Sequence, residues 1–396
     1  MKLLPVDEAR ARMLAEISPL PAESVPLAES AGRVLAERVL ARRDQPPFDA
    51  SAMDGYAVRS EDTPDSLTVI GESAAGHAFA GALSPGQAVR IFTGAAIPSG
   101  ADTVIIQEDV QREGDRITAP ATPPRRHLRP RAGDFASGQA LLEAGVRLDP
   151  WRMSLAASAG RAELTVGRRP RVAIFSTGEE IVSAPAEPGP FQIHDSGAPA
   201  IAMMCEAWGA QVSRHRPVRD ELAAVIEALG GARAELLVTV GGASVGDHDL
   251  VRAAAEALGF SPRVQSVAVR PGKPTFFGVL GDGRRLLGLP GNPASAFVCA
   301  ELFLKPLLSA WQGADPQPRL VAARAAAPLP ANGPREHWMR ARLQHRDGAL
   351  FVEPYADQDS SLVSVFAAAD ALARRLPGAA AVEAGGLVEV LPLARA

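Results

Sequence analysis

Three short stretches of this sequence combine glycine with hydroxyl side chains in a pattern that suits an anion. They are FSTGEE at 175–180, GGASVGDHDL at 241–250 and GLPGNPASA at 288–296. Glycine lets a ligand approach the backbone closely, and a helix that follows such a loop offers free N–H groups to negative charge. None of the three is a dinucleotide fingerprint or a Walker loop. Together they predict a site for a phosphate or a similar oxyanion, although any one of them could be an ordinary strand-to-helix turn. The hydroxyl donors are Ser176, Thr177, Ser244 and Ser295.

Acidic residues surround these stretches. A carboxylate beside a phosphate site repels the phosphate unless a divalent cation lies between them, so the pattern indicates Mg²⁺. Two residues have simpler interpretations: Asp220 precedes a helical run and can be its N-cap, and His248 can be exposed to solvent rather than bound to a metal. The acids are Glu179, Glu180, Asp195, Asp220, Asp247 and Asp249.

A further carboxylate, Asp54, lies in the irregular stretch PPFDASAMDGYAV at 46–58. Asp-Gly is a common turn pair, because Asp bonds its own backbone and Gly accepts a positive φ. The residues alone are therefore compatible with a simple hairpin tip.

The basic run RRHLRPRAGD at 125–134 has two interpretations. It can be a solvated loop. It can also be an anion clamp built from Arg125, Arg129 and Arg131, with Asp134 directed at a metal or an anion carrier.

The three glycine-rich stretches need a scaffold that brings them together. From about 168 to 311, strand-like runs such as RVAIFSTG, ELLVTVGG and RRLLGLPG alternate with helical runs such as DELAAVIEALGG. This alternation predicts a doubly wound sheet with parallel strands. Ligands bind beyond the carboxyl ends of the strands in such sheets, and each stretch begins at the end of a predicted strand. The three stretches are therefore expected to meet at one edge of the sheet.

The rest of the chain is predicted to form three further domains. Residues 46–136 have short apolar runs between Gly and Pro, which is typical of a β-rich domain. Residues 1–45 and 137–167 are expected to form one discontinuous helical domain, with helices at 6–17, from 27 to about 31, and at 149–160, where Asp149 is the N-cap. Residues 318–396 show no helical period and predict a C-terminal β domain.

Composition excludes several classes of protein. The chain has 396 residues, a formal net charge of −4 and two distant cysteines, Cys205 and Cys299. These features argue against nucleic-acid binding, a disulfide framework and a zinc ribbon. No uninterrupted apolar run reaches the roughly 18 residues that span a bilayer, and the N-terminus becomes charged within a few residues, unlike a secretory signal. We expect a soluble cytoplasmic protein with no membrane partner.

The motifs, taken in order, resemble those of the molybdopterin molybdenumtransferase family, which includes MoeA and the gephyrin E-domain. The resemblance rests on PPFDASAMDGYAV, RIFTGAAIPSGADTVIIQEDV, the basic run ending in Asp134, STGEE, GGASVGDHDL, RPGKP and GLPGNPASA, and it covers nearly the whole chain. It implies an α/β multidomain fold with a doubly wound domain similar to molybdopterin adenylyltransferases, a β-rich domain, a discontinuous helical domain and a C-terminal β-barrel-like domain. It also implies a homodimer that receives its substrate from a molybdopterin adenylyltransferase.

The resemblance further implies a reaction and a set of site residues. The enzyme takes adenylylated molybdopterin and molybdate, cleaves the adenylate with Mg²⁺ and places molybdenum on the pterin dithiolene, so the substrate supplies the sulfur. The implied catalytic residues are Asp54, Asp134, Glu180, Asp249 and Lys273, and the implied metal ligands are Glu180, Asp220 and Asp249. The expected substrate-binding residues are Thr93, Arg129, Arg131, Ser176, Thr177, Gly178, Asp195, Gly241, Gly242, Ser244, Gly246, Pro290, Gly291, Asn292 and Ser360.

Four positions depart from the family pattern: Ala50, Gly133, Gly197 and Arg270. They leave open a tungstate-preferring paralogue or reduced activity. Two other functions remain as alternatives. A non-catalytic scaffold would keep the molybdopterin site without turnover, and a molybdopterin adenylyltransferase would need only the doubly wound domain.

Overall fold

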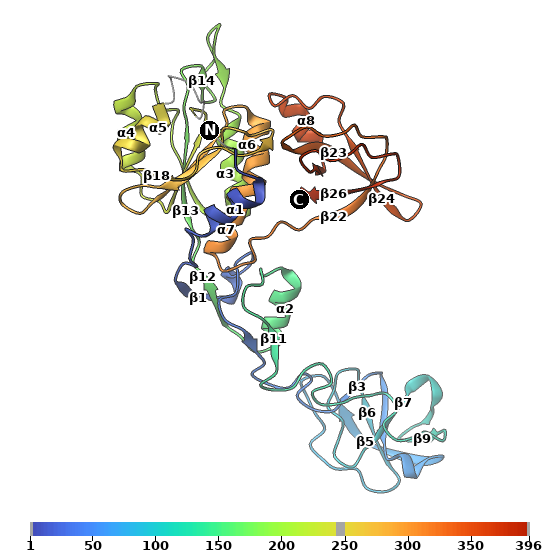
Figure 1. Cartoon of the computed structure of the whole chain (residues 1–396). Helices are drawn as coiled ribbons and strands as arrows, with labels where there is room; N and C mark the ends of the chain where they lie inside the picture. The colour runs from blue at the N-terminus through green and yellow to red at the C-terminus, as the bar shows by residue number, and fades with distance from the viewer. Residues whose placement is uncertain (1–2, 243–249, 394–396) are drawn as a thin grey trace. The chain divides into compact units, whose positions relative to one another are not determined.

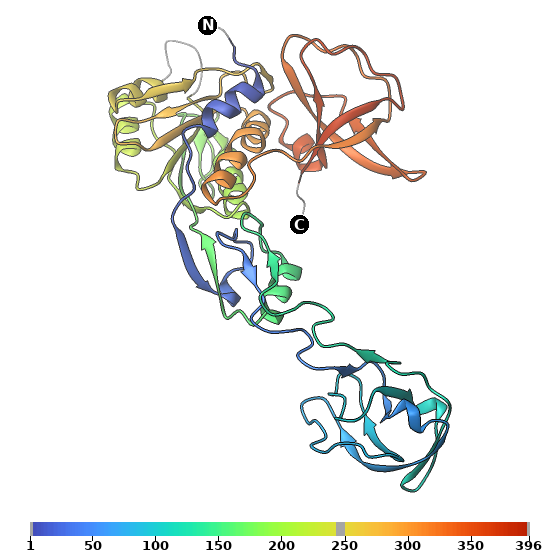
Figure 2. The same ribbon diagram turned by 60° about the horizontal axis from the view of Figure 1, so that its bottom comes forward.

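The computed structural model describes residues 3–242 and 250–393 (Figures 1 and 2). The chain divides into two compact units. The first contains residues 1–23, 32–36 and 165–396, and the second contains residues 24–31 and 37–164. The finer division into four domains stays a prediction.

A six-stranded sheet forms the doubly wound part of the first unit, with the order β16-β13-β17-β21-β20-β18. The first four strands are parallel, as the sequence predicted, and β20 and β18, for which the sequence analysis predicted no strand, are antiparallel to their neighbours. The strand β20 runs antiparallel to β21 because only residues 280–284 join them, and a parallel crossover needs a dozen residues or more. The strands are β13 (Arg171–Ser176), β16 (Gln211–Arg214), β17 (Leu236–Val240), β18 (Ser261–Val264), β20 (Phe276–Val279) and β21 (Arg285–Leu289).

Helices cover both faces of this sheet (Figure 1). One face packs against α4 and α5 through a cluster that includes Val225, Leu229 and Val251. The other packs against α1, α3, α6 and α7 through a cluster that includes Val6 and Ile201. The helices are α1 (Val6–Leu14), α3 (Gly197–Ala207), α4 (Leu222–Gly231), α5 (Leu250–Ala257), α6 (Pro293–Cys299) and α7 (Lys305–Trp311), with a π-helical turn at Ala300–Leu304 between the last two.

One segment of the described chain, Pro293–Trp311, is long and apolar enough on average to cross a membrane. It is not an uninterrupted apolar run, since Glu301 and Lys305 lie within it. Of its most apolar window, 83% is buried inside the protein, as expected for a core helix.

A β-barrel forms the C-terminal part of the first unit. The strand order β23-β24-β22-β26-β25 closes on itself because β25 also pairs with β23. The closure confirms the predicted barrel-like domain, although the short helix α8 (Val363–Ala368) was not predicted. A strand from the doubly wound part, β19 (Val269–Arg270), pairs with the start of β23. The barrel strands are β22 (Val321–Ala325), β23 (Glu336–Arg346), β24 (Ala349–Pro354), β25 (Ala371–Arg375) and β26 (Leu387–Pro392).

The second unit contains the β-rich region, whose six-stranded sheet has the order β7-β4-β6-β5-β9-β8. The helix predicted at 149–160 is α2 (Pro150–Ser158), and Asp149 caps it by accepting a hydrogen bond from the Arg152 amide. The helix predicted from residue 27 is instead a single 3₁₀ turn at Leu27–Glu29, because Pro26 and Gly32 leave too few residues for an α-helix. The sheet strands are β4 (Gly55–Val58), β5 (Asp65–Ser73), β6 (Gln87–Ile91), β7 (Thr103–Ile106), β8 (Gln111–Glu113) and β9 (Arg116–Ala119).

Short strands complete the topology. In the second unit, β3 (Ala50–Ser51) pairs with β10 (Leu128–Arg129) and β2 (Val39–Leu40) pairs with β11 (Ala140–Leu142). In the first unit, β14 and β15 form a small parallel pair above the doubly wound sheet (Figure 1). These two strands are β14 (Ile181–Val182) and β15 (Ile193–His194). A separate pair is formed by β1 (Ala22–Pro26) and β12 (Glu163–Gly167). There are also 3₁₀ turns at Ser60–Asp62 and Gln107–Asp109.

Candidate functional site

A cavity of about 1690 Å³ lies in the first unit, between the carboxyl ends of the parallel strands and the C-terminal barrel. The ends of β13, β17 and β21 all reach it, as the sequence predicted for the three glycine-rich stretches. The structure therefore brings together most of the site residues expected in this unit. Those that line the cavity are Ser176, Thr177, Gly178, Glu180, Asp195, Asp220, Gly241, Gly242, Lys273, Pro290, Gly291, Asn292 and Ser360.

Asp195 has an ordering role in this wall. Its carboxylate accepts a hydrogen bond from Ser176 Oγ at 2.6 Å and another from the backbone N–H of Ala198 at 3.1 Å. These two bonds join the end of β13 to the first turn of α3. Asp195 thus lines the cavity with both oxygens already occupied by the protein.

Thr177 presents a hydroxyl group without a partner. The residue is 5% exposed, and its Oγ1 makes no hydrogen bond within the described chain. Gly241 and Gly242 both have positive φ and lie so close that a Cβ on either would fall within 3.2 Å of this Oγ1. A buried hydroxyl without a partner costs free energy, so a ligand that bonds to Thr177 removes that cost.

Two acids of the cavity, Glu180 and Asp220, lie on neighbouring loops. The Glu180 carboxylate folds back over Gly178, where a Cβ would lie 2.6 Å from its Oε2. Asp220 accepts a hydrogen bond from the Glu179 amide at 3.2 Å. It does not cap α4, which begins after Glu221, so the interpretation of Asp220 as a helix N-cap was wrong.

These two carboxylates suit a hard cation such as Mg²⁺, which proteins often hold through one or two carboxylates with substrate phosphate and water. Within residues 3–242 and 250–393, no group of three or more His, Cys, Asp or Glu is placed to hold a metal ion. The third expected ligand, Asp249, lies outside the described residues, as do Ser244, Gly246, Asp247 and His248.

The loop after β21 is tied to the segment that follows the barrel strand β24. Asn292 Nδ2 donates to Ser360 Oγ at 2.8 Å, and the amide of Ala294 donates to the Ser360 carbonyl at 3.2 Å. Two predicted site residues that line the cavity are thus in direct contact. Lys273, from the RPGKP stretch, lines the same cavity.

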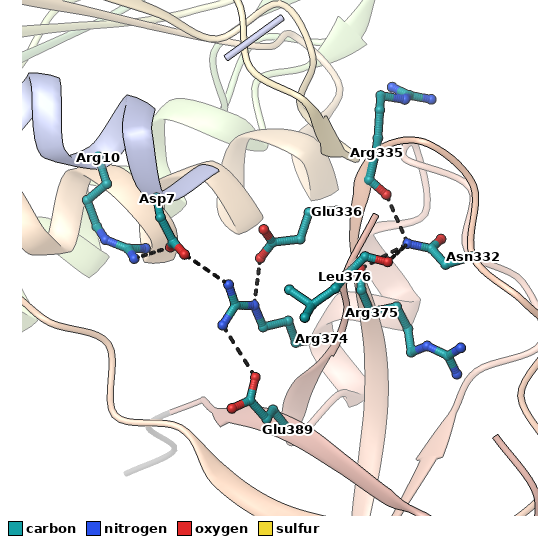
Figure 3. A network of polar contacts seen from close by, with 9 residues as sticks. All are labelled: Asp7, Arg10, Asn332, Arg335, Glu336, Arg374, Arg375, Leu376 and Glu389. Carbon is teal, nitrogen blue, oxygen red and sulfur yellow. Dashed lines mark hydrogen bonds and ion pairs between the residues drawn. The ribbon is translucent and has the colours of Figure 1, made fainter. Parts of the chain in front are cut away.

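The barrel side of the cavity is basic, and the sequence analysis missed most of it. Arg270, Arg335, His337 and Arg375 line it (Figure 3 shows Arg335 and Arg375), and Arg340 lies buried nearby. Burial, with a smaller contribution from the charges of these four arginines, lowers the pKa of His337 to about 4. The stretch REHWMR at 335–340 places charged and polar residues in a strand next to Trp338. These residues can be recognised as part of a cavity only when the strands that pair with this one are known.

The second unit holds the other predicted residues. Asp54 accepts hydrogen bonds from the Thr93 amide at 2.7 Å and from Thr93 Oγ1 at 2.8 Å. These bonds lower the pKa of Asp54, and Arg90 adds a smaller effect in the same direction. The turn is therefore fixed with its acid ionised. It is not a two-residue hairpin tip, because β4 pairs with β6 and β7 and the stretch before the turn pairs with β10.

The basic run folds along the stretch that precedes Asp54. Arg129 lies opposite Ala50 in the β10–β3 pair, and the Asp134 amide donates to the Gln45 carbonyl. Arg131 Nε donates to Asp44 at 2.6 Å, so its guanidinium already has a carboxylate partner. The structure thus brings the basic run beside the Asp54 turn but leaves the anion-clamp hypothesis untested.

Two departures from the family pattern have a local explanation. A Cβ at Gly197 would lie 2.8 Å from Val240 Cγ1, and a Cβ at Gly133 would lie 2.9 Å from the Pro130 carbonyl oxygen. Larger side chains would need a different backbone at both places. Ala50 is buried in the β3–β10 pair, and Arg270 belongs to the basic side of the cavity.

The fold and the cavity define a doubly wound α/β protein with an anion-suited cavity at the strand ends, joined to a barrel and a β-rich unit. Family models match most of the chain: the MoeA N-terminal region (domains I and II) at residues 4–160, a probable molybdopterin binding domain at 173–310, and the MoeA C-terminal region (domain IV) at 322–393. The chain belongs to the MoeA family, and it is an enzyme. The resemblance seen in the sequence is confirmed.

Individual relatives are similar over most of their length. The molybdopterin molybdenumtransferase of Nostoc sp. PCC 7120 is 38% identical over 342 residues, which cover 82% of this chain and 78% of that protein. The molybdopterin molybdenumtransferase of Bacillus subtilis 168 is 36% identical over 408 residues, covering 98% and 94%. The crystal structure of a molybdopterin biosynthesis MoeA protein from Pyrococcus horikoshii OT3 has a TM-score of 0.83 at 27% identity, covering 99% of this chain and 100% of that chain.

Proposed function

We propose that this enzyme transfers molybdenum to molybdopterin, taking the adenylylated form of molybdopterin and releasing AMP in a Mg²⁺-dependent step late in molybdenum cofactor biosynthesis. The observation that carries the proposal is the single cavity that the ends of β13, β17 and β21 share with Lys273 and Ser360. Membership of the MoeA family and the names of the relatives support the transfer of molybdenum itself.

The strand-end wall suits the phosphate side of such a substrate. Thr177 offers a buried hydroxyl, and Gly241 and Gly242 leave the space that a ligand needs beside it. The Asn292–Ser360 bond holds the loop after β21 against the other side of the cavity. Lys273 supplies a positive charge for an anionic group.

Glu180 and Asp220 are the described residues that would hold Mg²⁺, with Asp249 as a third ligand in this proposal. When bound, the ion offsets the negative charge of the adenylate phosphates, which these carboxylates would otherwise repel. The protein's own contribution is to hold Glu180 over Gly178 and to fix Asp220 through the Glu179 amide.

We further propose a cytoplasmic homodimer in which Asp54 and Asp134 of one subunit position molybdate at the cavity of the other. The fixed, ionised turn of Asp54 supports a role in the reaction, because an exposed acid held by two hydrogen bonds keeps a single orientation. A molybdopterin adenylyltransferase is the natural donor of the substrate.

The direct test is AMP release from adenylylated molybdopterin, with molybdate or tungstate and with or without Mg²⁺. We expect release and metal insertion to require Mg²⁺ and one of the oxyanions. Binding without turnover under every condition would favour the non-catalytic scaffold. Consumption of ATP with unmodified molybdopterin would favour an adenylyltransferase, and faster turnover with tungstate would identify a tungstate-preferring paralogue.

The subunit arrangement has its own test. Asp54→Asn is nearly isosteric and suits a turn, and Glu180→Gln changes the opposite wall. In a two-fold dimer, a mixed pair of these variants has one site with both changes and one with neither. Mixed dimers should regain up to about half of the wild-type activity per dimer by this symmetry. If mixed dimers form and stay as inactive as each parent, Asp54 does not serve the partner subunit.

A further inference from the structure

Arg90 and Gln107 lie near the two ends of the stretch RIFTGAAIPSGADTVIIQEDV at 90–110. Arg90 is on β6, and Gln107 directly follows β7. These two strands flank β4, which begins at Gly55, the residue after Asp54. Both ends of the stretch therefore lie beside the turn that carries Asp54.

Arg90 binds the backbone of this turn. Its Nη1 donates to the Gly55 carbonyl at 2.8 Å, and its Nη2 donates to Gln107 Oε1. The backbone N–H of Gln107 in turn donates to the Asp54 carbonyl at 3.1 Å. Two successive carbonyls, those of Asp54 and Gly55, are thus held by Arg90 and its partner.

The guanidinium of Arg90 also packs against two aromatic rings. Its Cζ lies 5.2 Å from the ring centroid of Tyr56 and 4.7 Å from that of Phe92. Arg90 and Tyr56 are register partners, so their side chains project from the same face of the sheet. A cation over an aromatic face is attracted to it, which restrains the half-buried arginine side chain. Phe92 directly precedes Thr93, the partner of the Asp54 carboxylate.

The carboxylate of Asp54 is held on one oxygen. The Thr93 amide and hydroxyl both donate to Oδ1, which leaves Oδ2 for a ligand within the described chain. Arg90 on β6 is the charged group that lowers the pKa of Asp54, after the larger effect of the Thr93 bonds. The acid joined to this cluster is Glu108, which accepts a hydrogen bond from Gln107 Nε2 at 3.1 Å.

The turn has no room to shift toward β7. A Cβ on Gly55 would lie 1.9 Å from the Ile105 carbonyl oxygen, so β4 approaches β7 as closely as glycine permits. The neighbouring strand therefore limits the turn on one side, and the bonds from Arg90 hold it on the other.

We propose that Arg90 is a positioning residue for Asp54. Its guanidinium fixes the backbone that follows Asp54, and its packing against Phe92 fixes Thr93, which orients the carboxylate. In this arrangement Arg90 bonds to the protein and not to the substrate. The consequence for turnover rests on the proposed function, whereas the positioning itself does not.

Titration of the Asp54 carboxyl carbon by NMR tests the positioning in the full chain without any substrate. The resonance is assigned by its loss in Asp54→Asn. We expect Arg90→Gln to raise the pKa of Asp54, because the positive charge is removed and the Thr93 bonds loosen. The matched control is Arg112→Gln, since Arg112 reaches the Tyr56 hydroxyl at 3.4 Å from β8 but does not bond to the turn. This control should leave the pKa of Asp54 unchanged.

Arg90→Lys keeps the test decisive if Arg90→Gln does not fold. Lysine retains the charge but cannot reproduce the planar fork that reaches Gly55 and Gln107 together, so the pKa of Asp54 should rise less than in Arg90→Gln.

Turnover gives the second measurement. In both Arg90 variants, kcat for AMP release should fall about tenfold or more, with KM changing by less than about twofold. Arg112→Gln should keep the wild-type kcat. Absence of AMP release by the wild type would refute the proposed function, and the carboxyl titration would still decide the positioning. An unchanged pKa of Asp54 in a folded Arg90→Gln would overturn the inference. Wild-type pKa and kcat in a folded Arg90→Lys, or an equal change in Arg112→Gln, would overturn it too.

Discussion

The two walls of the cavity are built in different ways. The strand-end wall consists of contiguous loops, in which Ser176, Thr177 and Gly178 follow one another along the chain. The barrel wall consists of Arg270, His337 and Arg375, which are far apart in sequence and meet only through strand register. The first wall combines glycine, hydroxyls and carboxylates, and the second combines two arginines with a buried histidine.

This difference has a chemical consequence. Acids next to a phosphate repel it unless a cation lies between them, whereas arginines attract a negative charge directly. Under the proposed function, the strand-end wall would therefore need Mg²⁺ to hold a phosphate, and the barrel wall would not. The predictions below separate the two walls by changing one at a time.

The largest effect is expected from Glu180→Gln. Loss of this carboxylate should reduce the rate of AMP release about a hundredfold or more, the usual scale for a charged group that stabilises a reacting centre. The rate is measured with saturating adenylylated molybdopterin, molybdate and Mg²⁺. Glu179→Gln is the matched control, because Glu179 is adjacent but does not line the cavity. Binding of inorganic phosphate by Arg270, His337 and Arg375 should not change in Glu180→Gln. If this variant loses both AMP release and phosphate binding, a change in the strand-end wall also alters the barrel wall.

A smaller effect is expected from Gly178→Ala. Gly178 has φ +132, and a Cβ there would collide with the Glu180 carboxylate. The strain should lower the free energy of unfolding by about 1–3 kcal/mol, and displacement of Glu180 should reduce AMP release roughly tenfold. Gly313→Ala tests strain alone, since Gly313 has φ +83 and open space around its Cα. Equal losses of activity in both variants would show that Glu180 is not displaced.

The difference between the two walls of the cavity also explains which residues could be predicted from the sequence. The strand-end wall was predictable because glycine, hydroxyl and acid occur within a few residues, next to strands whose apolar runs are plain. The antiparallel strands β18 and β20 were not predicted, since a short hairpin and a helix crossover leave similar apolar runs. The barrel wall was not predicted because His337 and Arg375 become neighbours only when β23 pairs with β25. The N-cap interpretation of Asp220 was wrong because a capping pattern and an inter-loop bond to the Glu179 amide look alike in sequence.

The barrel wall also predicts a pH effect on stability. The pKa of His337 is about 4 in the folded protein, below the ordinary value of 6.5. The unfolded chain therefore binds more protons than the folded chain between these values, so stability rises with pH across that window and falls as the pH drops. His337 should cost up to about 3 kcal/mol at the acid end. The free energy of unfolding, measured by chemical denaturation between pH 7 and pH 4, should fall less steeply with decreasing pH in His337→Gln than in the wild type. An identical slope in both proteins would place the histidine in contact with water.

The smallest effect is expected from Arg131→Gln in the second unit. Its guanidinium pairs with Asp44, but 67% of the side chain is exposed. Exposed ion pairs contribute little, because water and salt screen them. If Arg131 captures oxyanions, the half-saturating molybdate concentration should rise by at most about fivefold, and excess molybdate should restore the rate. Arg375→Gln should raise the same quantity more if free molybdate binds at the barrel wall, since Arg375 is buried. A larger effect from Arg131→Gln than from Arg375→Gln would reverse this ranking and move the principal oxyanion contact to the second unit.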